Sequence, residues 1–328
     1  MRIGVALPQR VDSGIGPPGW PRLRDLAVRL ETAGYDGLWV SDRSFTDPEH
    51  PSGTGGHLDS MVLLPALAAA THRVTLGTMD VAVGFRPPAV LAKAAASLDR
   101  LSAGRFVLGL GAGSDEAGYV AAGLDFPAIE DRMADLEEAA ILIREMTSQS
   151  HATVTGPRFR VQNAPNLPQS TQQPVPILMS AGGPHGLRAA AGSADIWHLS
   201  GPFSPHGYAV EAARFDRACH DAGTDPHAVR RSLGLVARVG EDERDVRRRH
   251  ADWRQQAPGQ WGTSPEALRS RGLAGTPHQV GERIQEFVAL GVSELVLSFA
   301  PIEFGWCSSA GWDIVATEVL PSFGQASR

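Results

Sequence analysis

The sequence predicts an α/β protein in which eight strands alternate with helices and close into a (β/α)8 TIM barrel. Short, almost continuously apolar runs recur near residues 3, 38, 75, 107, 178, 196, 235 and 297. Such runs are typical of parallel strands buried on both faces, and segments with helical spacing lie between them. Eight βα units in roughly 200 to 400 residues are typical of this barrel. We expect a single domain over residues 1–328, with a doubly wound open sheet as the alternative architecture.

The stretch 73–113 contains the clearest strand–helix–strand unit. Two apolar runs, 74–78 and 106–110, flank an Ala-rich helix that is opened by Pro87 and Pro88. Proline is tolerated in the first turn of a helix, where its missing N–H would have no partner in any case. Ligands of such units bind beyond the carboxyl ends of the strands, so the loops after both strands are expected to border the site.

The elements before this unit follow from the same reasoning. Strands are expected at 2–7 and 37–40, and helices at 20–34 and 58–71. The first helix carries its apolar residues on one face and ends at a glycine. Residues 43–57, rich in Pro, Gly, Ser and His, form a longer loop than is usual, which points to a functional or mobile segment.

After a helix at 128–146, the rhythm breaks between residues 150 and 175. A short run around Gly156 and Pro157 predicts a hairpin, and a connector rich in Pro and Gln follows. We interpret this segment as an insertion into the barrel. The alternation then resumes, with strands at 177–180, 194–199, 233–239 and 295–299 and helices at 186–191, 208–222, 241–253, 277–290 and 313–320.

Composition and charge argue against several classes of function. The net charge of −6 argues against a nucleic-acid partner, which needs a basic surface. No apolar run approaches about 20 residues and no signal-peptide pattern opens the chain, so we expect no membrane span and a cytoplasmic protein. Cys219 and Cys307 offer neither a disulfide framework nor metal-ligand spacing, and no metal is expected.

Two further sequence features are better explained by structure than by function. Gly109, Gly111 and Gly113 have the wrong spacing for a dinucleotide fingerprint, so we favour a strand end that needs close backbone approach. Lys93 is the only lysine and lies inside a predicted helix, which does not fit Schiff-base catalysis in a barrel.

Three strand ends carry candidate functional groups. Asp42 and Arg43 end the second strand, where Arg43 either binds an anion or pairs with a neighbouring aspartate. Gly182 and Gly183 precede a helix, so their N–H groups either face an anion or form an ordinary turn. His198 ends the sixth strand and should face the mouth, as an acid–base group or as a structural histidine. The catalytic candidates are Asp42, Arg43 and His198.

Six segments together resemble the luciferase-like flavin-dependent oxidoreductases, especially the branch that uses the deazaflavin coenzyme F420. No single segment is specific, but the ordered set is, and the resemblance implies a barrel with an insertion. The segments are AGYDGLWVSDR (33–43), LDSMVLLPALAAATHRVTLGT (58–78), PPAVLAKAAASLDRLSAGRFVLGLGAG (87–113), PVPILMSAGGPHGLRAAAGSADIW (174–197), GTPHQVGERIQEFVALGVSELVLSF (275–299) and EVLPSF (318–323).

The resemblance implies a cofactor site for F420, with FMN as the alternative. Relatives carry a non-proline cis peptide that backs the flavin ring, and by position it falls between Met79 and Asp80. In relatives the Gly-rich turn after the fourth strand lies beside the ring, and the turn after the fifth holds the cofactor phosphate. The implied cofactor-binding residues are Asp42, Thr78, Met79, Asp80, Gly111, Gly113, Ser114, Ala181, Gly182 and Gly183.

Two positions depart from the family pattern. Arg43 stands where deazaflavin relatives commonly have a histidine, and Ser114 stands where some have a glutamate. The proton-transfer roles of that histidine and glutamate are therefore not carried over. Both departures argue against a sugar-phosphate dehydrogenase of the type those residues serve.

We expect F420-dependent hydride transfer to or from a small organic substrate, by a homodimer as is common among relatives. The alternatives are an FMN-dependent two-component monooxygenase that uses reduced flavin and oxygen, and a non-catalytic flavin-binding relative. Loop residues Phe45, His57, Tyr119 and Phe203 suggest a partly aromatic, uncharged pocket.

Overall fold

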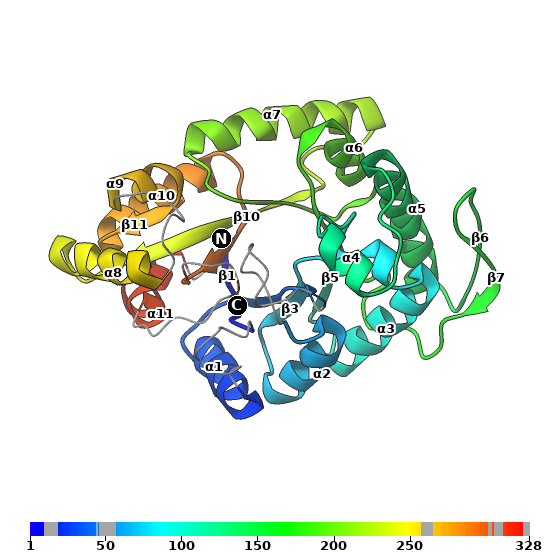
Figure 1. Cartoon of the computed structure of the whole chain (residues 1–328), viewed down its shortest axis with the longest axis horizontal. Coiled ribbons are helices and arrows are strands. Elements are labelled where there is room, and N and C mark those ends of the chain that lie inside the picture. Colours follow the sequence, from blue (N-terminus) through cyan, green and yellow to red (C-terminus); the bar gives the residue numbers. More distant parts are fainter. Residues whose placement is uncertain are drawn as a thin grey trace.

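The fold is a closed barrel of eight parallel strands, as predicted (Figure 1). Neighbouring strands pair in the order β1, β2, β3, β5, β8, β9, β10, β12, and β12 pairs back with β1. The computed structural model describes residues 1–9, 19–43, 45, 57–256, 265–300, 304 and 311–323. The barrel strands are β1 (Arg2–Ala6), β2 (Gly37–Val40), β3 (Thr75–Thr78), β5 (Phe106–Gly111), β8 (Ile177–Ser180), β9 (Ile196–Ser200), β10 (Arg230–Val239) and β12 (Glu294–Ser298).

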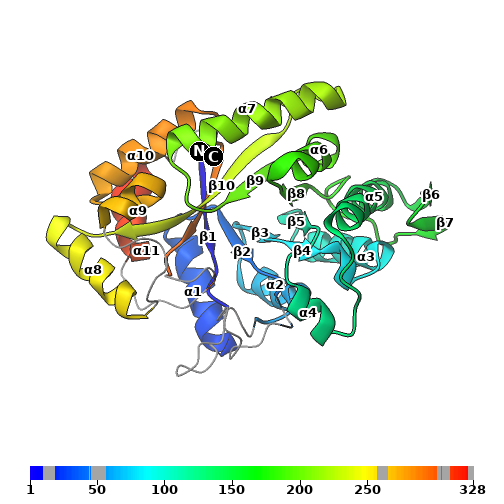
Figure 2. The same cartoon turned by 45° about the horizontal axis from the view of Figure 1, so that its top comes forward.

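Helices surround the barrel, and their apolar faces pack on the outward side chains of the strands (Figures 1 and 2). Their bounds lie within a few residues of the expected ones. None of the helices in the described part of the chain is long and apolar enough to cross a membrane. The helices that follow the strands are α1 (Trp20–Thr32), α2 (Ser60–Ala70), α3 (Pro88–Leu101), α5 (Ile129–Ser148), α6 (Gly183–Ser193), α7 (Pro205–Ala222), α8 (Glu243–Gln256), α10 (Pro277–Ala289) and α11 (Gly311–Ile314), which continues through η2 (Val315–Val319) and η3 (Leu320–Ser322).

The insertion is also confirmed. β6 (His151–Thr155) and β7 (Arg160–Pro165) form an antiparallel hairpin that projects from the barrel beside α5. Figure 2 shows the hairpin at the edge of the molecule, away from the carboxyl ends of the barrel strands. The hairpin is therefore an attachment to the barrel wall and contributes nothing to the strand-end loops.

Several short elements were not expected from the sequence. The two short strands among them pair with a barrel strand: β4 with β5, and β11 with β10. Because such short segments are stabilised by tertiary pairing, local periodicity gives little indication of them. They are β4 (Val81–Ala82), η1 (Val83–Phe85), α4 (Glu116–Ala121), α9 (Pro265–Arg271) and β11 (Leu273–Gly275).

Trp39 fills the inside of the barrel. Its side chain is fully buried, and it packs among inward residues of the other strands, including Met79 and Val296. A Cβ atom added at Gly77 would lie 2.3 Å from Cζ3 of Trp39, and one at Gly4 would lie 2.9 Å from Nε1. Glycines therefore leave the space that the indole occupies, and the packed indole closes the barrel below its carboxyl-end mouth.

We expect Gly77→Ala to lower the free energy of unfolding by about 1 to 3 kcal/mol, because the new methyl group overlaps the Trp39 ring. Urea unfolding followed by circular dichroism would measure this loss. Gly192→Ala is the matched control, since Gly192 lies exposed in α6 and a Cβ there meets no atom within 4 Å. The control should be neutral or stabilising by up to about 1 kcal/mol. Equal effects of the two substitutions would contradict the packing argument.

Candidate active site

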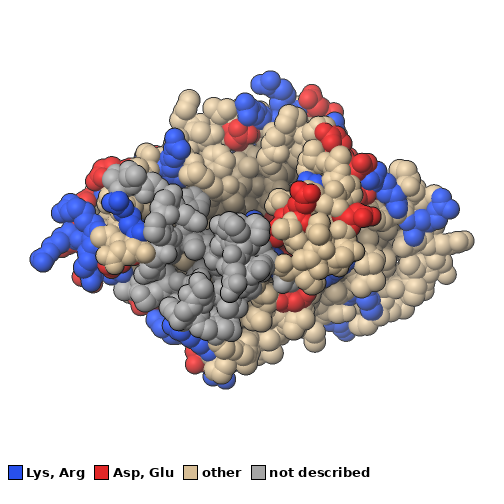
Figure 3. Space-filling view, viewed as in Figure 1, with Lys and Arg blue, Asp and Glu red and all other residues tan. Residues whose placement is uncertain are grey.

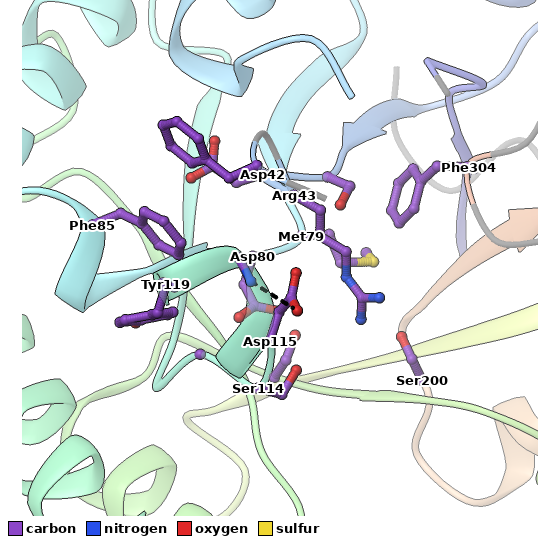
Figure 4. A pocket seen from close by; sticks show the side chains of 16 residues that line it. Asp42, Arg43, Met79, Asp80, Phe85, Ser114, Asp115, Tyr119, Ser200 and Phe304 are labelled. Carbon is purple, nitrogen blue, oxygen red and sulfur yellow. Dashed lines mark hydrogen bonds between the residues drawn. The ribbon is translucent and has the colours of Figure 1, made fainter. Parts of the chain in front are cut away.

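A cavity lies at the carboxyl ends of the strands, where three predicted turns meet (Figure 4). Residues 41–43 follow β2, Met79 and Asp80 follow β3, and residues 113–115 follow β5. The last residues of β8 and β9, Ser180 and Ser200, complete the wall. Parallel strands end at one edge of the barrel, so turns far apart in sequence converge there.

A second cavity adjoins the first and shares Met79 and Ser200 with it. Its described lining is small and uncharged, with Gly201 and Gly234 on one side and Val296 on the other. The first cavity carries Asp42, Arg43, Asp80 and Asp115. The prediction of an uncharged pocket is therefore wrong for the first cavity and holds for the described lining of the second.

Asp42 is held by an ion pair that the sequence did not indicate. Nη1 of Arg86 lies 2.5 Å from Oδ2 of Asp42, and the Oγ of Ser60 donates to Oδ1 at 2.6 Å. Arg86 also pairs with Asp59, whose carboxylate caps α2 by accepting from Met61 N–H. These contacts of Asp42, Asp59, Ser60 and Arg86 hold three segments together: the end of β2, the start of α2 and the segment after β4. Asp42 lines the cavity, but its oxygens already have partners, which suits a positioning role.

Arg43 has a different environment from Asp42. Its side chain is exposed and lines the cavity, and Figure 4 shows the guanidinium pointing into it. The carboxylate of Asp42 next to it is paired with Arg86 instead. Arg43 therefore borders the space that a ligand would occupy, and its two interpretations, an anion-binding group or an ion pair with a neighbouring aspartate, both stay predictions.

Asp80 lies in the cavity wall directly after a cis peptide bond, between Met79 and Asp80, where the family resemblance placed it. A Cβ at Gly111 would lie 1.5 Å from Oδ2 of Asp80, so a glycine is needed there to make room for the carboxyl group. Burial raises the pKa of Asp80, although the Ser180 hydroxyl and the charge of Arg43 act to lower it. The neutral acid is therefore favoured more than in an exposed aspartate.

His198 is buried below the cavity and does not line it. Its ring is 0% exposed, with Nδ1 2.8 Å from Oγ of Ser232 and Nε2 2.7 Å from Oγ of Ser200. Burial lowers the pKa of His198 to about 3, so the ring is neutral near physiological pH. Ser200, two residues further along the same face of β9, is the residue that reaches the cavity.

The glycines at the end of β5, Gly109 and Gly111, serve close strand packing. Oγ1 of Thr78 accepts from Gly109 N–H at 2.7 Å and donates to the Gly109 carbonyl at 3.0 Å. A Cβ at Gly109 would lie 2.0 Å from the Thr78 carbonyl oxygen, and Gly113 has a φ of 80°. This agrees with the strand-end interpretation of the glycines. Thr78 and Gly111 thus shape the wall, whereas Gly113 and Ser114 line the cavity itself.

The turn at Ala181, Gly182 and Gly183 follows Ser180 but does not line the cavity. Ala181 is buried and its carbonyl accepts from Nε1 of Trp197. Gly182 is the N-cap of α6, and Gly183, with a φ of 68°, opens the helix. A Cβ at either glycine would meet no atom within 4 Å, so their backbone borders open space.

Aromatic side chains form the remaining wall, only part of which was anticipated. Phe45 and Tyr119 line the cavity as expected, whereas His57 and Phe203 lie outside its described lining. Phe85 was missed; its ring centroid lies 4.4 Å from that of Tyr119. Phe304 was also missed. Phe85 ends the short helix η1, and Phe304 follows β12 in the chain by six residues. Their positions shortly after strands offered only a weak signal in the sequence.

Acidic side chains gather beside the cavity. Figure 3 shows them over α4 and α5, to the right of the grey atoms. Glu116, Glu130 and Asp131 are exposed in the first turns of these helices. Within the described residues no group of three His, Cys, Asp or Glu side chains is arranged to hold a metal ion.

Arg86→Gln should lower the free energy of unfolding by about 2 to 4 kcal/mol, since it leaves a carboxylate that is 2% exposed without its cation. Arg24→Gln removes an exposed pair with Asp25 and should change it by less than about 0.5 kcal/mol. Urea unfolding at neutral pH compares the two. A loss for Arg86→Gln as small as that of the control would show that the ion pair is unimportant.

His198 should make the protein less stable in acid. The unfolded chain takes up a proton on His198 below about pH 6.5, whereas the folded chain does so only near pH 3. As the pH is lowered between these two values, the free energy of unfolding therefore falls by about 1.4 kcal/mol for each pH unit. His198→Gln removes this contribution, so its urea unfolding should depend less on pH between about pH 6.5 and about pH 5. Parallel pH dependences would refute a buried neutral histidine.

Comparison with known proteins agrees with the fold. A curated relative from Kineococcus radiotolerans, named F420-dependent glucose-6-phosphate dehydrogenase, is 39% identical over 175 residues, 53% of this chain and 50% of that protein. The chain spans about half the length of the curated relatives it matches. Monooxygenase RslO1 from Streptomyces bottropensis superposes with a TM-score of 0.78, at 21% identity over 99% of this chain and 100% of that one. An F420-dependent secondary alcohol dehydrogenase, solved with an F420-acetone adduct, superposes with a TM-score of 0.79, at 19% identity over 99% of both chains.

These structural neighbours share the barrel, and their low identity supports the fold alone. The family model described as luciferase-like monooxygenase matches residues 1–294. That match takes in seven barrel strands and the first residue of the eighth, β12, together with the turns after β2, β3 and β5 that build the cavity. The chain therefore belongs to the luciferase-like monooxygenase family.

Proposed function

We propose that the protein is an F420-dependent oxidoreductase that transfers a hydride between the deazaflavin and a small organic substrate. The observation that carries the proposal is that the turn at Met79 and Asp80, the turn at Gly113 and Ser114, and Arg43 line one and the same cavity. The name of the relatives that match half of the chain supports F420 over other flavins.

The residues fit a flat, phosphate-bearing cofactor. The backbone at Met79 and Asp80 would back the ring, and the turn at Gly113 and Ser114 would lie beside it. Gly182 offers unobstructed backbone at the start of α6, where the helix dipole favours a phosphate. When bound, F420 supplies a ring carbon that accepts or gives up a hydride, and the protein orients it and excludes water.

We further propose that the substrate is not a sugar phosphate. The second cavity, next to Met79, has a small and uncharged described lining. The acidic side chains over α4 and α5 would repel an anion that approaches from their side. Arg43 and Ser114 stand where deazaflavin relatives have a histidine and a glutamate. The presence of Arg43 and Ser114 supports a substrate other than the glucose-6-phosphate in the names of the curated relatives.

Two alternatives remain distinguishable. An FMN-dependent two-component monooxygenase would use the same cavity with reduced flavin and oxygen, and purified protein with bound FMN would be yellow. A non-catalytic relative would bind flavin without turnover. A homodimer is proposed from the family resemblance alone, and light scattering of the purified chain would measure its oligomeric state. A cytoplasmic location is proposed from the N-terminal sequence pattern and the two isolated cysteines.

Separate titrations with F420 and FMN test the cofactor. We expect F420 to bind at least about tenfold more tightly, a difference of about 1.4 kcal/mol, measured by quenching of tryptophan fluorescence. Tighter binding of FMN, with oxygen consumption when reduced FMN is supplied, would favour the monooxygenase instead. Binding of F420 without turnover of imines, enones or quinones would favour the non-catalytic relative.

The phosphate position is tested by Gly182→Asp. The residue has a φ of −126° and open space at its Cβ, and aspartate is a favourable N-cap, so the fold should be kept. The added charge should weaken F420 binding about tenfold or more by repelling the phosphate. Gly182→Asn is the matched neutral control and should bind within about threefold of the parent. Equal affinities of the two variants would place the phosphate elsewhere.

A further inference from the structure

The cavity contains several ionisable groups, and most of them are already engaged. Asp42 is paired with Arg86 and also accepts from Ser60. Asp115 caps α4 by accepting from Gly118 N–H at 3.2 Å. The contacts of these two carboxylates hold parts of the fold together.

The other candidates for proton exchange are poorly suited to it. His198 is enclosed by Ser200 and Ser232 below the cavity, and its low pKa keeps it neutral. Tyr119 is 2% exposed, and burial raises the pKa of its hydroxyl above the usual value of a phenol. Tyr119 therefore keeps its proton at physiological pH.

Asp80 differs from these groups in its position. It follows the cis peptide that would back the cofactor ring, and its carboxyl group occupies the space above Gly111, in the wall of the cavity. The groups that face it are Arg43 and Asp42 from the end of β2, Ser180 from the end of β8 and Tyr119 from α4. Among these, Arg43 brings the only positive charge, and burial outweighs it.

We propose that Asp80 is the residue that holds and exchanges the substrate proton in this cavity, in place of the histidine and glutamate that Arg43 and Ser114 replace. The proposal deepens the proposed function and rests on it. The proposal rests on the position of the Asp80 carboxyl group in the cavity wall, next to the turn that would contact the cofactor ring. It also rests on the ion pair of Asp42 and the hydrogen bond of Asp115, which already use those two carboxylates.

The step balances with the cofactor already proposed. In the reducing direction, an electrophilic carbon of a substrate C=O bond or conjugated enone would accept a hydride from reduced deazaflavin. The atom at the other end of that polarised bond or conjugated system would accept the proton of the Asp80 carboxylic acid. The deazaflavin is left oxidised, and Asp80 regains its proton from water. In the oxidising direction, the Asp80 carboxylate would take the hydroxyl proton of an alcohol, and the hydride of its C–H bond would pass to oxidised deazaflavin, which would thereby be reduced.

Infrared spectroscopy of the protein without cofactor provides the first test. Asp80→Asn keeps the shape of the side chain and cannot release a carboxyl proton. In the parent, we expect a protonated-carboxyl band that persists above the pH range in which an exposed aspartate loses its proton, and we expect this band to be absent in Asp80→Asn. Burial also raises the pKa of Glu294, at the other end of the barrel, so a second band from Glu294 should remain in both. An unchanged band pattern in Asp80→Asn would overturn the proposal.

Turnover provides the second test, with reduced F420 and the probes 2-cyclohexen-1-one and menadione. Asp80→Asn should lower kcat by about 100-fold or more while F420 affinity stays within about threefold. The parent should also lose kcat for reduction as the pH rises through the Asp80 titration, a dependence that Asp80→Asn lacks. Asp125→Asn, at an exposed residue outside the cavity lining, is the control and should match the parent.

The two tests separate the possible failures. A parent protein that does not bind F420 would refute the proposed function, while the infrared band would still report whether Asp80 holds a proton. If F420 binds and the parent turns over a probe, near-parental kcat in Asp80→Asn would overturn the role of Asp80 and leave the proposed function intact. If the infrared spectrum shows no Asp80 band, the proposed role of Asp80 is overturned whatever the result of the turnover test.

Discussion

The packing of Trp39 inside the barrel is the constraint on which the site depends. Barrel interiors are filled by side chains, and here one indole takes the volume that glycines on β1, β2 and β3 leave free. Met79 packs in the same buried cluster and reaches the cavity above it. The indole thus supports the floor on which the turns after β2, β3 and β5 converge. A smaller residue at 39 would leave a void below the site.

Carboxylates of the same chemical type acquire different properties in this site because their neighbours differ. Asp42 is nearly inaccessible and meets a guanidinium and a hydroxyl group, so it fixes three segments together. Asp80 meets a glycine, a serine and low-dielectric surroundings, so the neutral acid is favoured. Residue type alone cannot separate these roles, since the separation arises from desolvation and from the charges that the fold brings near.

The sequence predicted the fold more completely than the site. All eight barrel strands and the hairpin insertion lie where periodicity placed them, because each buried strand carries its own apolar pattern. The loop expected after the apolar run at 106–110 contains α4, and β11 was missed. These segments are too short to show a period. The family resemblance, rather than periodicity, located the cis peptide between Met79 and Asp80.

By itself the sequence determined the order of strands and helices, the strand ends that build the cavity, and the glycines that let strands approach closely. Only the tertiary structure decided which side chains face a ligand. Arg86 lies 44 positions from Asp42, and no local pattern indicates their ion pair. His198 sits on the inward face of β9 but one layer below the mouth, a depth that depends on how the strands are staggered. Strand periodicity is local, whereas ion pairing and burial depend on how the barrel closes.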